Sequence, residues 1–162
     1  MNPIITLVDY SDVTLAVIEQ TERLAKALGL PVILVHVIAQ DPMAVVGEPA
    51  SQIPSEEERA ELIAKDLRRL SGLADRLRGA GVEAEVRQLV DTDIEKALAE
   101  CGHWNAGFIV VGSHHHGALY NWFVGSVTSD VLRTANCPVL VVPPNPVPTN
   151  PEPQEKLHVL SR

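Results

Sequence analysis

Short apolar runs alternate with amphipathic stretches along most of the chain. Residues 3–8 and 31–38 are two continuous apolar runs rich in β-branched side chains, a pattern typical of strands buried on both faces. Between them, residues 14–28 have helical spacing with one apolar face, which we expect to be buried. That face consists of Leu15, Ile18, Ala25 and Leu28. A strand, a helix and a second strand in this order predict a βαβ unit with parallel pairing.

Polar residues and a glycine mark the ends of this first helix. Ser11 and Asp12 are candidate N-caps, because their side-chain oxygens can accept hydrogen bonds from the free amides of a first helical turn. Gly29 stands where a C-cap with a left-handed backbone is expected. These signals predict a helix over residues 14–28.

A longer helix is predicted over residues 55–78. Ser55 followed by Glu58 fits a capping box at its start, and Gly79 and Gly81 mark its end. Leucines at helical spacing predict a buried stripe along this helix. The stripe consists of Leu62, Leu67, Leu70, Leu73 and Leu77.

The second half of the chain continues the alternation. Residues 82–90 alternate between apolar and polar, so this strand has one wet face or lies at an edge of the sheet. Residues 106–111 and 138–142 are two further predicted strands, and helices are predicted from about 92 to 101 and from 126 to 134. The order of elements predicts an α/β fold, a three-layer, doubly wound, Rossmann-like sheet of five parallel strands with helices on both faces.

Length and proline content divide the chain into a globular part and a tail. The 162 residues suffice for one domain, which we assign to residues 1–143. Six of the twelve prolines fall between Pro143 and Pro153, a density that neither a helix nor a central strand accepts. We therefore predict an extended proline-rich tail at 144–162. Residues 39–55 lack periodicity and predict a long loop.

Charge and cysteine content exclude several classes of protein. The formal net charge of −8 disfavours nucleic-acid binding and polybasic attachment to membranes. No apolar run approaches the ~20 residues of a membrane span, and the start of the chain lacks the basic segment of a secretory signal. We therefore expect a cytoplasmic protein with no membrane insertion. Cys101 and Cys137 lie far apart and have no CxxC partner, so we expect buried, inert thiols.

Candidate chemistry gathers where the predicted parallel strands end. Asp9 follows the first strand, Val37 lies near the end of the second, and Gly112 ends the fourth. In an open parallel sheet, ligands bind beyond these carboxyl ends. Ser126 and Thr128 begin the last helix, where free amides and these two hydroxyl groups could donate to a phosphate without help from Lys or Arg. Asp9 could accept hydrogen bonds from a ribose or an adenine amino group. A Gly-Ser pair at a helix start is also a common N-cap, so spacing alone leaves a purely structural role open.

Several segments together resemble the universal stress protein family. They are Val110-Val111-Gly112-Ser113-His114, Gly117-Ala118-Leu119-Tyr120, Val124-Gly125-Ser126-Val127-Thr128 and Cys137-Pro138-Val139-Leu140-Val141-Val142-Pro143. The resemblance runs over residues 3–143 and includes Val8-Asp9 and His36-Val37. It is specific, because it combines a strand, a loop of fixed spacing, a helix start and a second strand.

The resemblance implies a fold, an assembly and a ligand. The implied fold is a five-stranded parallel sheet of the adenine nucleotide alpha hydrolase-like type, with residues 1–143 as a universal stress protein domain. The implied assembly is a homodimer that pairs the last strands, here Pro138 to Val142. Many family members bind ATP through a G-x-x-G-x9-G-[S/T] loop, so ATP (or AMP or ADP) is the implied ligand, accompanied by Mg²⁺. The implied nucleotide contacts are Asp9, Val37, Val111, Gly112, His115, Gly125, Ser126, Val127 and Thr128.

One position departs from the family's loop. Gly112 matches the first glycine and Gly125 the last, but His115 stands in place of the second glycine. A left-handed backbone at this position would cost a non-glycine residue about 1 kcal/mol, and the imidazole either fills the phosphate site or donates to a phosphate. Consecutive histidines at 114–116 cannot easily turn three rings to one ion, so we predict no metal site of the protein's own.

Three functions remain open on the sequence. The first is a stress-response regulator, a dimer that binds ATP or AMP and acts on a protein partner that the sequence does not name. The second is a nucleotide-free dimeric scaffold whose site is closed by His115. The third is a slow ATPase or phosphotransferase. The chain has no Walker lysine motif, nucleophile elbow or base–nucleophile pair, so we predict no catalytic residues and no enzyme.

Overall fold

The computed structural model describes residues 2–38, 55–90, 92, 96, 99, 103–113 and 126–144, except the side chains of residues 126 and 127. The elements are β1 (Ile4–Leu7), α1 (Thr14–Leu28), β2 (Val32–Ile38), α2 (Glu56–Gly79), β3 (Ala84–Val90), β4 (Phe108–Gly112), α4 (Ser126–Thr134) and β5 (Val139–Val142). The five strands form one sheet in the order β3-β2-β1-β4-β5, and all neighbouring strands are parallel. The predicted doubly wound α/β fold is confirmed.

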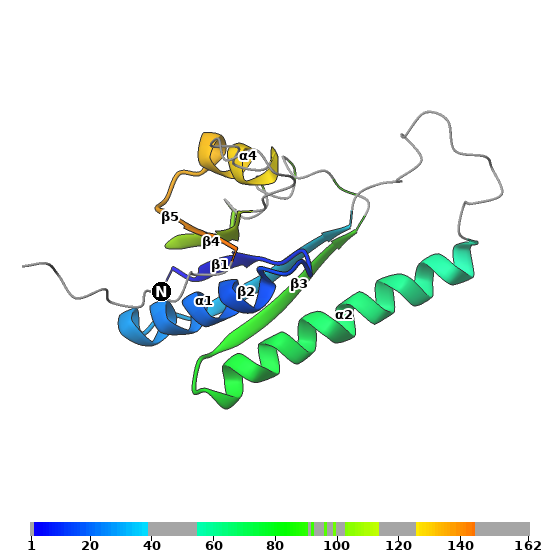
Figure 1. Cartoon of the computed structure of the whole chain (residues 1–162), viewed down its shortest axis with the longest axis horizontal. Coiled ribbons are helices and arrows are strands. Elements are labelled where there is room, and N and C mark those ends of the chain that lie inside the picture. Colours follow the sequence, from blue (N-terminus) through cyan, green and yellow to red (C-terminus); the bar gives the residue numbers. More distant parts are fainter. Residues whose placement is uncertain are drawn as a thin grey trace, which may run out of the picture.

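Helices cover both faces of this sheet. α1 and α2 lie against one face, and α4 lies against the other (Figure 1). One apolar cluster joins Ile18 of α1 and Leu70 of α2 to Leu34 of β2, and a second joins Val131 of α4 to Val35 of β2. Because successive side chains of a strand point to opposite faces, neighbouring residues of β2 serve different clusters. A fully buried Leu, Ile or Val contributes about 1.5–3 kcal/mol, so both clusters stabilise the fold.

The ends of α1 agree with the sequence at one end and differ at the other. Gly29 is the predicted C-cap, with a left-handed φ of 64°. The predicted N-caps are wrong, because the N-cap is Val13 and no side chain caps the helix. Ser11 instead belongs to a turn that precedes the helix, in which its carbonyl accepts from the Thr14 amide at 3.1 Å. This turn follows directly on β1 and shapes the candidate site.

The start of α2 agrees with the prediction in full. Ser55 Oγ accepts from the Glu58 amide at 3.2 Å, and Glu58 Oε2 accepts from the Ser55 amide at 2.7 Å. Each side chain thus satisfies a backbone donor that the helix itself leaves without an acceptor.

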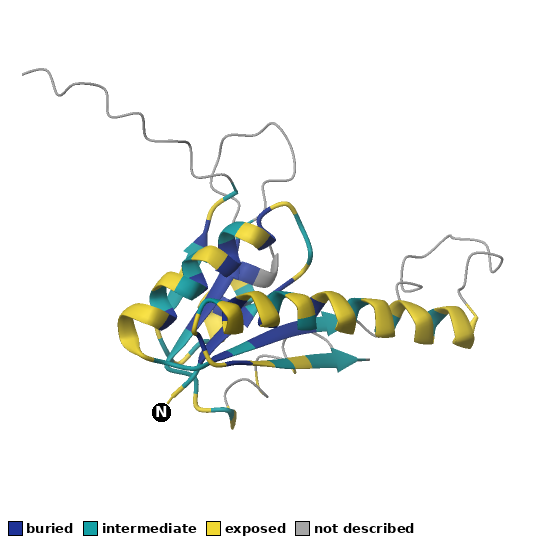
Figure 2. Ribbon diagram, turned by 90° about the horizontal axis from the view of Figure 1, so that it is seen from below, coloured by how far each residue is buried: buried dark blue, intermediate teal, exposed yellow. Residues whose placement is uncertain are grey.

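The predicted apolar faces are only partly buried. Leu70 and Leu77 of α2 are fully enclosed, but the first turns of α2 extend past the carboxyl ends of the strands, where no sheet lies beneath them (Figures 1 and 2). In α1 the buried face is rotated toward Thr21, whose hydroxyl hydrogen-bonds that of Thr6 in the core at 3.0 Å. The leucines that the pattern wrongly places inside are Leu15, Leu28, Leu62 and Leu67, exposed to 56%, 46%, 53% and 40%.

β3 is an edge strand, as its alternation predicts. Cys137 is half-buried, and burial raises the pKa of its thiol, which keeps it protonated. No helix among the described residues combines the length and the apolar character that crossing a bilayer requires. The predicted loop, most of the helix at 92–101 and nearly all of the tail lie outside the described residues.

Candidate functional site

The structure brings three of the predicted site residues to one edge of the sheet. β1 lies between β2 and β4, with Leu7 level with Val35 and Thr6 level with Val110. Two residues further along each strand, Asp9, Val37 and Gly112 therefore stand at neighbouring carboxyl ends. From β1 the chain continues to β2 and β3 on one side of β1, and then crosses to β4 and β5 on its other side. The carboxyl ends of β1 and β4 are therefore the switch point of the strand order.

The two predicted valines face the helix that the motif places at the site. Val37 and Val111 both pack in the cluster on the α4 side of the sheet. Val111 is only 4% exposed, whereas Val37 is partly accessible. Of the two, only Val37 has a side chain that a ligand could reach, and Val111 could contribute only through its backbone.

Asp9 is exposed at the end of β1 and takes part in a turn. Its Oδ1 accepts from the Ser11 amide at 3.1 Å, the bond of an Asx turn. Between these two residues, Tyr10 has a φ of 60°, in the left-handed region that residues with a Cβ seldom adopt. The carboxylate is thus held by a locally constrained backbone.

Gly112 and Thr128 have structural roles that the sequence did not reveal. A Cβ on Gly112 would lie 2.7 Å from Val13 Cγ2 and 3.3 Å from Val17 Cγ2, so glycine is required here for α1 to pack. Thr128 is 2% exposed, and its Oγ1 donates to the Gly112 carbonyl at 2.9 Å. The proton of the Thr128 hydroxyl, which we expected to serve a phosphate, is thus engaged inside the protein, and a contact of Thr128 with a nucleotide stays a prediction.

The start of α4 retains the features that suit an anion. Its first turn, Ser126 to Thr128, carries no acidic side chain, and the amides of a first turn have no acceptor within the helix. His115 and Gly125 lie outside the described residues, so the structure does not place them. Within the described part of the chain, no three His, Cys, Asp or Glu side chains are arranged to hold a metal ion.

The sequence missed two residues beside the site. His36 is 9% exposed and its Nδ1 lies 2.7 Å from the Val8 carbonyl. Tyr10 donates its hydroxyl to the Asp66 carbonyl of α2 at 2.6 Å. The available signals were weak: a histidine within an apolar strand, and an aromatic residue directly after a strand-terminal carboxylate.

Comparison with known proteins supports the resemblance. A sequence profile of the universal stress protein family matches residues 1–143. Comparison with curated protein sequences finds no match. Among solved structures, the chain is similar to a universal stress protein from Archaeoglobus fulgidus, at 25% identity and a TM-score of 0.68 over 88% of this chain and 98% of that one.

Two similar structures contain a nucleotide. The universal stress protein from Archaeoglobus fulgidus in complex with dAMP is 25% identical, with a TM-score of 0.65 over 88% of this chain and 98% of that one. A universal stress protein in complex with cAMP is 21% identical, with a TM-score of 0.61 over 89% and 98%. At 21% identity, the similarity to the cAMP complex supports the fold alone.

Proposed function

The chain belongs to the universal stress protein family, and from this premise we propose that it binds an adenine nucleotide at the carboxyl ends of β1, β2 and β4. The proposed ligand is ATP, with ADP or AMP as weaker alternatives. The proposed role is that of a cytoplasmic regulatory dimer, which changes its interaction with a protein partner when the nucleotide is bound. A ligand produces such a change only through different affinities for two states of the protein.

The observation that carries this proposal is that Asp9 and Val37 lie at neighbouring carboxyl ends of the sheet, beside the start of α4, whose Thr128 hydrogen-bonds Gly112 at the end of β4. A relative of the same fold, 25% identical, has been solved with dAMP, which supports an adenine nucleotide as the ligand. Asp9 would accept hydrogen bonds from the ribose or the adenine amino group, and Val37 would contact the base. The first-turn amides of α4, with Gly125 and His115, would receive the phosphates.

Magnesium would bind through the nucleotide. The described residues provide no cluster of three His, Cys, Asp or Glu ligands, and Mg²⁺ in nucleotide sites commonly takes phosphate oxygens and waters with one or two carboxylates. We therefore expect Mg²⁺ to affect this protein only when a nucleoside polyphosphate is present.

Isothermal titration with ATP, ADP, AMP and dAMP tests the proposal. We expect one nucleotide bound per chain and a rise in melting temperature. Asp9→Asn keeps an oxygen for the turn but removes the charge, and loss of a charge-assisted hydrogen bond should weaken binding about tenfold. Asp12→Asn makes the same charge change at an exposed position three residues further along the chain and should leave affinity unchanged.

The opposite result identifies the alternative. Absence of heat and of thermal stabilisation with all four nucleotides would overturn the proposal. Binding that is absent in the wild type and present in His115→Gly would instead support the nucleotide-free scaffold with a closed site. Sustained phosphate release that Asp9→Asn abolishes would replace regulatory binding by slow turnover.

The proposed homodimer pairs β5 with its copy, and β5 is a more apolar outer strand than β3, as such pairing requires. On the outer strand β5, Leu140 is 37% exposed and its neighbours are half-buried. On the other outer strand, β3, the exposed Glu85 and Arg87 form an ion pair of 2.9 Å. Charged side chains discourage strand addition, so an apolar β5 is the edge more suited to a second copy.

Light scattering after size exclusion tests this assembly. Leu140→Glu should convert a dimer to a monomer, because it places a charge within the paired strands. Leu62→Glu is the matched control, since Leu62 is 53% exposed on α2, which packs against β3 at the other side of the sheet. A monomeric wild type, or a dimer that survives Leu140→Glu, would contradict the proposed interface.

A further inference from the structure

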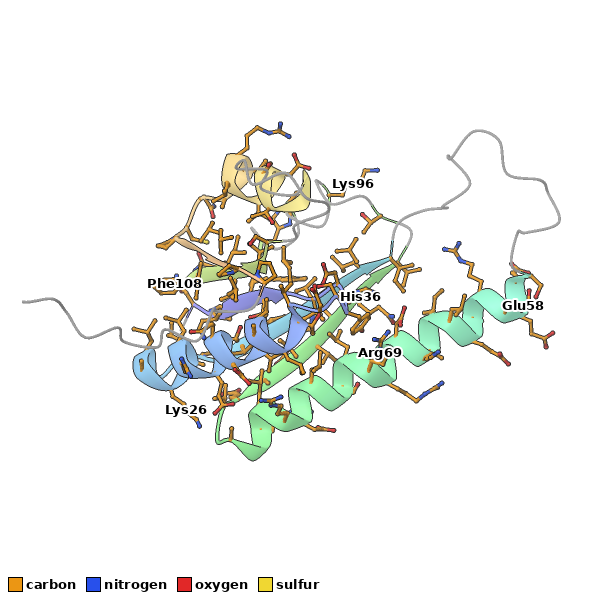
Figure 3. All side chains as sticks on the ribbon, in the orientation of Figure 1. Lys26, His36, Glu58, Arg69, Lys96 and Phe108 are labelled. Carbon is orange, nitrogen blue, oxygen red and sulfur yellow. The ribbon has the colours of Figure 1, made fainter. Side chains whose placement is uncertain are left out.

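A compact polar cluster lies behind the proposed site, on the α2 side of the same strand ends. The Tyr10 ring centroid is 4.4 Å from that of His36, and its hydroxyl donates to the Asp66 carbonyl at 2.6 Å. The Arg69 guanidinium, which comes from α2, lies 4.1 Å from the Tyr10 ring centroid. Figure 3 labels Arg69 and His36. We call Tyr10, His36, Asp66 and Arg69 the Tyr10 cluster.

The electrostatics of the cluster keep the Tyr10 hydroxyl a donor. Burial, and after it the Asp66 carboxylate, raise the pKa of Tyr10 to about 12, against a smaller opposite effect of Arg69. His36 Nδ1 is engaged with the Val8 carbonyl at 2.7 Å, and its Nε2 lies 3.8 Å from Asp66 Oδ2. Tyr10 is therefore anchored to α2 by a hydrogen bond to Asp66 and a cation–π contact with Arg69, and to β2 by its ring contact with His36.

The backbone of Tyr10 is strained, and the anchoring of its side chain can maintain that strain. A φ of 60° is sterically unfavourable for a residue with a Cβ and persists only where the surroundings impose it. This left-handed residue reverses the chain so that the Ser11 amide reaches Asp9 Oδ1 at 3.1 Å. The contacts of the Tyr10 side chain with α2 thus hold the turn, and the turn orients the Asp9 carboxylate.

We propose that Tyr10 is a positioning residue: its side chain, anchored on α2, imposes the left-handed turn that presents Asp9 to the nucleotide. The inference rests on the proposed function for its ligand, and the turn itself is a property of the free protein. Among the described residues, the Tyr10 side chain packs with the α1 and α2 side of the sheet, whereas Val37 of the proposed site packs with the α4 side.

Two substitutions separate the ring from the backbone. Tyr10→Ala removes the anchor but keeps a Cβ, so the turn relaxes from the left-handed region and nucleotide affinity falls about tenfold, or 1.4 kcal/mol. Tyr10→Gly also removes the anchor, but glycine adopts a positive φ without steric cost, so affinity stays within about threefold of wild type. Because glycine is also the less strained of the two at this φ, global stability follows the same order. The affinities are therefore compared at a temperature where both variants are fully folded.

Titration calorimetry with ATP, together with amide exchange at Ser11 in the nucleotide-free protein, provides the test. We expect weak binding and faster Ser11 exchange in Tyr10→Ala, with both recovered in Tyr10→Gly. Ala74→Gly, at a fully buried position of α2, lowers global stability without touching the cluster and controls for general loosening.

The outcomes are distinct for the two proposals. Wild-type affinity in Tyr10→Ala, or equal loss in Tyr10→Gly, overturns the positioning role. A wild type that binds no nucleotide overturns the proposed function instead, and Ser11 exchange then decides the inference. Equal exchange in the wild type and both variants overturns it, and fast exchange in Tyr10→Ala alone supports it.

Discussion

Replacing Gly112 by alanine distinguishes a glycine needed for packing from a glycine needed for a ligand. The new Cβ would lie 2.7 Å from Val13 Cγ2 and 3.3 Å from Val17 Cγ2. Both valines are 2% exposed, and a β-branched side chain has little rotamer freedom in a helix, so the contact cannot be relieved cheaply. Overpacking of this kind costs about 1–3 kcal/mol. We expect a loss near 2 kcal/mol and a melting temperature roughly 4–8 °C lower.

Urea denaturation followed by circular dichroism measures this change, with an unchanged m value expected. Gly72→Ala is the matched control, because a Cβ there meets nothing within 4 Å, and on an exposed helix it should add about 0.5–1 kcal/mol. Val13→Ala removes the opposing methyl group, so its combination with Gly112→Ala should cost less than the sum of the two. If Gly112→Ala keeps full stability and loses only nucleotide affinity, glycine serves the ligand and the packing argument is refuted.

Four further predictions concern single interactions. Thr128→Val should lower the free energy of unfolding by about 0.5–1.5 kcal/mol in urea, because it removes a buried hydrogen bond to the Gly112 carbonyl, and Thr128→Ser should lower it less. Ser55→Ala should cost about 1 kcal/mol by loss of the N-cap. The hydrogen bond from the Ser55 amide lowers the pKa of Glu58 below 4.5, so the stability it contributes is present above that pH and is lost as pH falls further, a dependence that Glu58→Gln should reduce. Because the pKa of Tyr10 is raised from 10.0 to about 12, its contribution is present below pH 10.0 and lost between those values, and ultraviolet titration should show a late tyrosine that Tyr10→Phe removes.

The sequence predicted the elements well where local signals and tertiary contacts agree. Helix 14–28 is correct because a glycine free to adopt a left-handed backbone stands directly after its last turn. The predicted buried stripe of α2 is wrong near the start of the helix, where Leu62 is exposed. The first turns of α2 extend beyond the carboxyl ends of the strands, so no sheet covers them (Figure 2). The pattern of apolar residues states which face could be buried, and the length of the neighbouring sheet decides how much of it is.

The candidate site was predictable in outline for a related reason. Parallel strands bring their carboxyl ends together whatever the side chains are, so Asp9 and Gly112 could be placed at one edge from strand order alone. The commitment of the Thr128 hydroxyl to Gly112, and the approach of Val13 to the same residue, depend on how α4 and α1 pack. No local pattern encodes those distances, so the sequence could not reveal these structural roles of Thr128 and Gly112.

The two faces of the sheet give the proposed site and the Tyr10 cluster a necessary connection. His36 and Val37 are consecutive in β2 but pack on opposite faces, so a displacement of one must move the other. Binding free energies are reciprocal: if the contact of Tyr10 with Asp66 raises nucleotide affinity, the nucleotide must strengthen that contact by the same free energy. Occupancy of the site would then be felt on α2, an element that a nucleotide on the α4 face does not touch. Exchange of the α2 amides around Asp66 should therefore slow on nucleotide binding in the wild type and remain unchanged in Tyr10→Ala.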